Sequence, residues 1–194
     1  MTVANFLTLI RLILCPFFLV IYIYPNWFGL SPEVAVYVLL GLFLISEASD
    51  AVDGYVARRL GQVSDLGKLL DPMADSISRT TAILTFTHAP VNLPILFVFI
   101  LIYRDSVVST LRTICALKGM ALAARWSGKI KAGIQAIAIF VILLLLIPYT
   151  RGNLSQETLS TTSTILVGLA ALYTIYSGLE YIYVNRSYIA KMMK

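Results

Sequence analysis

Most acidic side chains of this sequence lie in one short stretch. Six of the ten carboxylates fall within 29 residues: Glu47, Asp50, Asp53, Asp65, Asp71 and Asp75. That stretch contains no histidine and no cysteine. Carboxylates without imidazole or thiolate partners suit hard divalent cations, and Mg²⁺ or Mn²⁺ is the usual choice where phosphate is also bound. The stretch is therefore a candidate metal and phosphate site.

The spacing of these residues predicts two helix faces. One face, at about 100° per residue, contains Asp50, Asp53, Gly54, Ala57 and Arg58. The second is a stripe with a spacing of four residues and contains Gly67, Asp71 and Asp75. Only eight residues separate Arg58 from Gly67, so we expect two antiparallel neighbouring helices whose acidic faces meet.

Four converging aspartates exceed what one Mg²⁺ needs, so we expect two ions that bridge a phosphoryl group. Arg58 suits a phosphate oxygen, and Gly54 and Gly67 leave room for a ligand close to the backbone. The alternative is a set of structural ion pairs between the aspartates and four basic side chains, Arg58, Arg59, Arg79 and Arg104.

The rest of the chain is too apolar for a soluble domain. Of 194 residues, 59% are hydrophobic and 13% charged, with mean hydropathy +0.85, against about 45–50% and 25% in ordinary domains. We expect an all-α integral membrane protein, a single domain over residues 1–194. Its six transmembrane helices are predicted at 6–24, 34–58, 68–88, 93–117, 130–149 and 159–184. Residues up to about Arg11 are a candidate interfacial helix.

The basic residues predict the topology. Eleven of fifteen flank alternate breaks or the chain ends: Arg11, Arg58, Arg59, Lys68, Lys118, Arg125, Lys129, Lys131, Arg186, Lys191 and Lys194. The other breaks carry only Arg151. The positive-inside rule therefore places both termini and the acidic site on the cytoplasmic side of a cell membrane. We expect this membrane to be the inner or plasma membrane of a bacterium. The net charge of +5 fits anionic lipid better than nucleic acid.

Arginines inside the predicted spans point to an anionic substrate. Arg104 and Arg112 are about 80° apart on one helix face and about 12 Å apart along it, and Lys129 and Lys131 begin the next segment. A phosphate group on a substrate fits this set, whereas a cationic amino-alcohol such as choline or ethanolamine does not. The alternatives are a salt bridge from Arg104 to Asp105, and snorkelling of Arg112 and the lysines to lipid headgroups.

Other residues are expected to be structural. Cys15 and Cys115 lie in apolar stretches and are interpreted as buried filler, and His88 as a solvated loop residue. Several aromatic residues fall near predicted span ends, as an interfacial belt would: Tyr22, Tyr24, Trp27, Trp126, Tyr149, Tyr181 and Tyr183.

The acidic stretch resembles the signature of the CDP-alcohol phosphotransferase family at all eight fixed residues over 26 positions: Asp50-x-x-Asp53-Gly54-x-x-Ala57-Arg58, eight residues, then Gly67-x-x-x-Asp71-x-x-x-Asp75. The resemblance implies six transmembrane helices in a homodimer with a di-metal site open to the cytoplasm. It also implies transfer of a substituted phosphate from a CDP-linked donor such as CDP-diacylglycerol to an alcohol, with release of CMP.

Carried over by position, Asp50, Asp53, Asp71 and Asp75 hold two Mg²⁺ or Mn²⁺ ions, and Asp75 is the general base. The resemblance assigns the CDP moiety to Asp50, Gly54, Ala57, Arg58 and Gly67. Similar stretches near Arg104, Lys129 and the segment 177–181 extend the likeness over nearly the whole chain. Two places depart from the pattern typical of family members that use glycerol 3-phosphate. At position 76 those members have lysine where this chain has Ser76, and at 103–105 they have Ala-Arg-Glu where this chain has Tyr-Arg-Asp. Among acceptors of such a reaction, the basic residues from Arg104 to Lys131 favour glycerol 3-phosphate, followed by inositol phosphate and then serine. An intramembrane prenyltransferase and a cation transporter are distant alternatives.

Overall fold

The protein is described here by a computed structural model that covers residues 3–59, 65–117 and 125–192, with side chains at 8–49, 72–115 and 125–189. Those residues form one short 3₁₀ helix, η1 (Pro25–Phe28), six α-helices and no strand. The α-helices are α1 (Val3–Ile23), α2 (Pro32–Arg59), α3 (Asp65–Thr85), α4 (Ile95–Leu117), α5 (Trp126–Thr150) and α6 (Gln156–Met192). This confirms an all-helical fold with six long elements, and α6 runs further than predicted.

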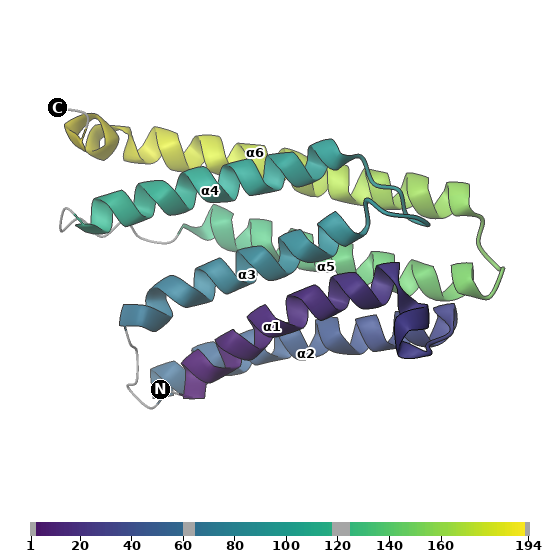
Figure 1. The fold of residues 1–194 in the computed structure, drawn as a ribbon. Helices are drawn as coiled ribbons and strands as arrows, with labels where there is room; N and C mark the ends of the chain where they lie inside the picture. The colour runs from purple at the N-terminus through teal and green to yellow at the C-terminus, as the bar shows by residue number, and fades with distance from the viewer. Residues whose placement is uncertain (1–2, 60–64, 118–124, 193–194) are drawn as a thin grey trace.

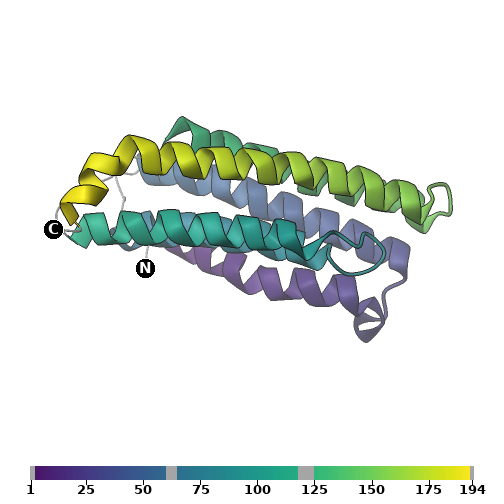
Figure 2. The same cartoon turned by 90° about the horizontal axis from the view of Figure 1, so that it is seen from above.

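The six helices lie side by side along one common direction (Figure 1). α1 packs on both α2 and α3, whereas α6 packs on α4 and α5. Figure 2 shows α4 and α6 running together along one face of the bundle. The start of α1 and the end of α6 lie at the same end of the bundle as the end of α2 and the start of α3 (Figure 1).

Three helices of the described chain are long and apolar enough to cross a membrane: Pro32–Ser49, Trp126–Thr150 and Gln156–Ile189. The apolar part of α1, Thr8–Ile23, is shorter. α3 and α4 have similar lengths, 21 and 23 residues, but they carry charged side chains within their length. Length and composition therefore support three of the six predicted membrane crossings, those of α2, α5 and α6.

The bundle is divided along its length into an apolar half and a polar half. The main core cluster, which includes Leu39, Phe86 and Leu143, lies toward the turns that join α1 to α2, α3 to α4 and α5 to α6. Buried charged side chains lie from the middle of the bundle toward the end with the termini: Arg79 lies past the middle of α3, Arg11 in the first half of α1 and Lys131 near the start of α5. The apolar half supplies the packing that holds the helices in register. The polar half is where chemistry is possible.

The N-terminal segment differs from the expectation for an interfacial helix. α1 is continuous over 21 residues, and Thr8 and Arg11 are 0% and 3% exposed. Arg11 therefore does not mark a cytoplasmic break as predicted. It faces the bundle because α1 packs between α2 and α3.

The structural residues largely follow the predictions. Cys15 and Cys115 are buried, and His88 is exposed in the turn after α3. Trp27 and Trp126 are 74% and 77% exposed, as interfacial anchors would be. Tyr181 is an exception to the predicted aromatic belt, because it lies inside the bundle.

Candidate active site in the polar half of the bundle

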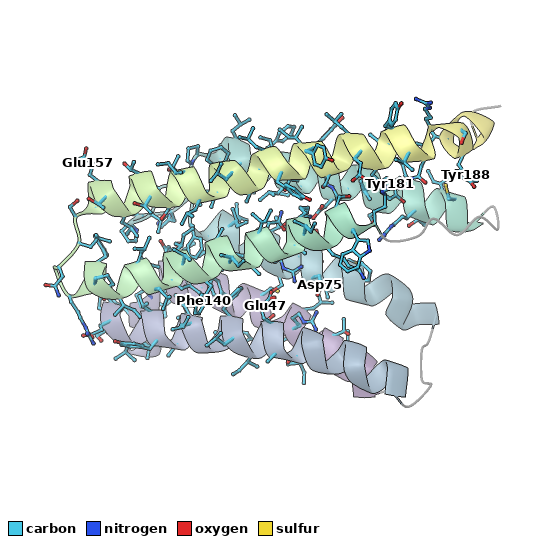
Figure 3. The ribbon with its side chains drawn as sticks, turned by 180° about the vertical axis from the view of Figure 1, so that it is seen from behind. Glu47, Asp75, Phe140, Glu157, Tyr181 and Tyr188 are labelled. Carbon is cyan, nitrogen blue, oxygen red and sulfur yellow. The ribbon has the colours of Figure 1, made fainter. Side chains whose placement is uncertain are left out.

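A chain of alternating charges links the first three helices. The Arg11 side chain of α1 forms an ion pair with Oδ1 of Asp75 on α3. On the other side of that carboxylate, Arg79 lies 4.0 Å from Oδ2 and also forms an ion pair with Glu47 of α2, with a nitrogen to oxygen distance of 3.4 Å. Figure 3 shows Glu47 and Asp75 close together in the interior. Asp75 is thus oriented from two helices, and its side chain remains 26% exposed.

A second charged cluster joins α3, α4 and α5 through Asp105. Its Oδ1 accepts from Nζ of Lys131 at 2.6 Å and from Arg104 at 3.0 Å, and its Oδ2 accepts from Ser76 Oγ at 2.7 Å. The two carboxylate oxygens are therefore satisfied by three donors. Two cations and one carboxylate give this cluster a net positive charge. The charge is buried, because Lys131 is only 7% exposed and Arg104 and Asp105 are each 14% exposed.

Two glycines shape the space around Arg104. A side chain carbon added at Gly178 of α6 would lie 2.9 Å from Cγ of Arg104, and one at Gly128 of α5 would lie 3.9 Å from its terminal nitrogen. Arg104 passes across α6 at a point where only glycine leaves room. Its position is set by packing as well as by its ion pair with Asp105.

Arg112, two turns further along α4, lies beside a different pair of residues. Its Cζ lies 5.9 Å from the ring centroid of Tyr181, and its Nε is buried without a hydrogen-bond partner. No salt bridge to Arg112 is present within the described part of the chain. Glu180, the acid next to Tyr181, accepts two bonds from Arg125, at 2.7 and 3.0 Å. Among the described side chains, Arg112 thus carries a positive charge without a matching acid.

The four basic residues expected to bind an acceptor occupy different surroundings. Arg104 and Lys131 meet at Asp105, which for Arg104 is the alternative salt bridge considered from the sequence. Lys131 is buried and does not snorkel. Lys129 is exposed, with its ammonium 4.9 Å from the Trp126 ring centroid.

Of the residues expected to bind donor and metal, Asp75 is the one whose side chain is described. The others lie on α2 or α3, but their side chains fall outside the described set: Asp50, Asp53, Gly54, Ala57, Arg58, Gly67 and Asp71. α2 and α3 are antiparallel and touch within the described residues, where Ser46 and Ser78 are 3.3 Å apart. The antiparallel contact of the two helices is confirmed. The meeting of their acidic faces and the roles of the motif residues stay predictions.

Sequence analysis gave no binding or catalytic role to four residues that the structure places in this region: Arg11, Ser76, Asp105 and Tyr181. Arg11 was interpreted as a topology marker, Tyr181 as a belt residue, and Ser76 and Asp105 as departures from the family pattern, with Asp105 also a possible partner of Arg104. The one available signal was the unusual depth of these polar residues in apolar segments, since intramembrane polar groups usually serve a function.

Known proteins match this chain over most of its length. Residues 1–176 match the family described as CDP-alcohol phosphatidyltransferase. The chain belongs to this family. A Bacillus subtilis (strain 168) protein named CDP-diacylglycerol–glycerol-3-phosphate 3-phosphatidyltransferase is 34% identical over 183 residues, 91% of each chain. A Haemophilus influenzae protein of the same name is 31% identical over 184 residues, 93% of this chain and 91% of the relative.

A more distant relative is a probable phosphatidylglycerophosphate synthase of Mycobacterium tuberculosis (strain CDC 1551 / Oshkosh), 28% identical over 179 residues, which cover 92% of this chain and 79% of the relative. Family membership makes the protein a phosphatidyltransferase. The apolar helices and the bacterial relatives make it a membrane protein.

CDP-alcohol phosphatidyltransferases use divalent metal ions, and the donor set of this chain fits them. The four motif aspartates offer only carboxylate oxygens, the ligands that Mg²⁺ and Mn²⁺ prefer. No group of three or more metal-binding side chains occurs among the described ones, where Asp75 alone represents the motif. The fit therefore rests on the chemistry of the donors and on the pairing of α2 with α3.

Proposed function

We propose that this protein transfers the phosphatidyl group of CDP-diacylglycerol to sn-glycerol 3-phosphate, which yields phosphatidylglycerophosphate and CMP. Two relatives above 30% identity over most of the chain are named for this reaction. The observation that carries the proposal is Arg112. An arginine inside an apolar helix costs about 3 kcal/mol on insertion scales, and here no described acid offsets it. A phosphate on the acceptor would supply the negative charge that balances Arg112.

The polar half of the bundle supports a phosphorylated acceptor in a second way. Arg104 and Lys131 together exceed the one charge of Asp105, so this buried cluster also keeps an excess positive charge. We assign the acceptor phosphate to Arg104, Arg112 and Lys131, with Lys129 at the exposed edge. A cationic amino-alcohol would be repelled from this set.

The donor belongs to the paired ends of α2 and α3. We propose that Asp50, Asp53, Asp71 and Asp75 hold two Mg²⁺ or Mn²⁺ ions, which would neutralise the donor pyrophosphate and make CMP a better leaving group. The CDP moiety is assigned to Asp50, Gly54, Ala57, Arg58 and Gly67. Small residues on the motif face let the nucleotide approach the backbone, and Arg58 pairs with a phosphate oxygen.

Asp75 is the proposed general base. It takes the proton of the acceptor hydroxyl while that oxygen attacks the phosphorus next to diacylglycerol and the bond from this phosphorus to the CMP oxygen breaks. Arg11 and Arg79 hold the carboxylate from two sides, and its partial exposure leaves it accessible to substrate.

We further propose that all six helices cross the membrane and that the protein acts as a homodimer. At 1.5 Å per residue, helices of 21 residues span about 31 Å, the thickness of the hydrocarbon core. The shared end of both termini fits an even number of crossings. The distribution of basic residues places that end, and the active site, in the bacterial cytoplasm.

The test uses purified protein in detergent with CDP-diacylglycerol, Mg²⁺ or Mn²⁺, and one acceptor at a time. CMP release is expected with sn-glycerol 3-phosphate and at most weakly with inositol 1-phosphate or serine. Release with inositol 1-phosphate alone would keep the phosphate argument but change the acceptor. Release with serine alone would overturn the acceptor site, and release of an inorganic cation across vesicles without CMP would overturn the enzyme class.

A further inference from the structure

The hydroxyl group of Tyr181 is an unusual feature of the polar half. Tyr181 is 2% exposed, and its hydroxyl oxygen is buried without a hydrogen-bond partner in the described part of the chain. Buried hydroxyls nearly always have a partner, because leaving one unsatisfied is costly. A phenylalanine would fill the same space without this cost. None of the described side chains supplies that partner, so a bound ligand is a candidate for it.

The surroundings of Tyr181 indicate the charge of that partner. The Arg112 guanidinium lies over its ring at 5.9 Å, also with a buried nitrogen that lacks a partner. Oε1 of Glu180 accepts from Arg125, its Oε2 is buried without a hydrogen-bond partner, and no ion pair joins Glu180 to Arg112 among the described side chains. Two unsatisfied donors, one of them positively charged, lie together between α4 and α6. An anion with several acceptor oxygens is the ligand that satisfies both.

We propose that the Tyr181 hydroxyl donates a hydrogen bond to the phosphate of the acceptor beside Arg112, and that it thereby selects phosphorylated over unphosphorylated alcohols. This inference rests on the proposed function, since it places a further residue in the acceptor site. Arg112 supplies the positive charge and its N–H donors, and the hydroxyl adds one further hydrogen bond to the same anion. Tyr181 is a specificity residue for the acceptor and has no part in donor binding.

Tyr181→Phe tests the proposal, with Tyr183→Phe as the matched control. Tyr183 lies two residues further along α6, is 65% exposed and stacks on Arg186 at 4.3 Å. The KM for sn-glycerol 3-phosphate is expected to rise roughly tenfold in Tyr181→Phe, the value of a hydrogen bond to a charged group. The KM for CDP-diacylglycerol is expected to stay within about twofold, and the control to leave both KM values unchanged.

Thermal unfolding without acceptor separates binding from structure. Because the hydroxyl has no partner among the described residues, Tyr181→Phe is expected to unfold at the same temperature as wild type or slightly higher. An acceptor KM within about twofold of wild type would overturn the proposal. A clear drop in unfolding temperature would also overturn it, because the hydroxyl would then have a structural partner.

A binding measurement distinguishes this inference from the proposed function. Inorganic phosphate is expected to raise the unfolding temperature of wild type and to protect Tyr181→Phe less. If wild type releases no CMP with sn-glycerol 3-phosphate but phosphate protection still depends on Tyr181, the proposed reaction fails and the anion site stands. If wild type turns over and phosphate protects both proteins equally, the role of Tyr181 fails alone.

Discussion

Gly178 is the residue whose replacement most sharply tests how α6 shapes the acceptor site. An alanine there would place its Cβ 2.9 Å from Cγ of Arg104. Carbon atoms pack at about 3.5–4.0 Å, so the overlap is about 0.6–1.1 Å. Cγ lies in the stem of the side chain and not at its flexible end. The arginine must therefore change rotamer, or α6 must move away from α4.

Either response disturbs the same ion pair. The Arg104 guanidinium is held at 3.0 Å by Asp105, so a change in the stem moves it away from this carboxylate. Overpacking of this size costs about 1–3 kcal/mol, which corresponds to roughly 5–150-fold in a binding constant. We expect Gly178→Ala to raise the KM for sn-glycerol 3-phosphate by at least about fivefold and to lower the unfolding temperature.

Gly133→Ala is the matched control, because a side chain at Gly133 of α5 meets nothing within 4 Å. Alanine is a better helix former than glycine by about 1 kcal/mol, so this variant should be as stable as wild type or more so. Both variants are compared by CMP release in detergent against acceptor concentration, and by thermal unfolding. If Gly178→Ala behaves like Gly133→Ala in both measurements, the packing argument for Arg104 is refuted.

Three further variants test separate contacts. Asp105→Asn leaves two buried cations without their shared carboxylate, so the free energy of unfolding should fall by about 3 kcal/mol; an unchanged denaturation midpoint would contradict this. Arg11→Gln should lower kcat at least about tenfold while the acceptor KM stays within about threefold, because Asp75 loses its orientation; a change confined to KM would argue against a positioning role. Arg151→Ala removes an exposed pair with Glu33 and should shift the unfolding temperature by less than about 3 °C; a larger drop in a thermal melt would show that this pair matters more than its exposure implies.

The helices were predictable because their signals are local. Turn residues mark the breaks: Pro25 begins η1, and the αL conformation of Gly29, with φ of 64°, closes it. The break after α3 likewise falls between Thr85 and Ile95, where Pro90 and Pro94 interrupt the apolar sequence. Short-range spacing also placed the motif on two consecutive antiparallel helices.

The contacts within the polar half were not predictable in the same way. Arg11 and Asp75 are 64 residues apart, and Lys131 and Asp105 are 26 apart. Their pairing depends on how α1 and α5 pack, which no local pattern encodes. The burial of Tyr181 was not predictable for the same reason. The sequence around an aromatic residue near the end of an apolar helix does not show whether the ring faces lipid or the bundle interior. The sequence shows where the charged residues lie along the chain, whereas the packing of the helices determines which of them form ion pairs.

The central claim is that interior cations bind the phosphate of the acceptor, and Arg112→Ala tests it most directly. The measurement is the initial rate of CMP release by purified protein, with sn-glycerol 3-phosphate and CDP-diacylglycerol varied in turn. We predict that the acceptor KM rises at least about tenfold, the value of one charged hydrogen bond, while the donor KM stays within about twofold. Equal changes in both KM values, or an unchanged acceptor KM, would contradict the account.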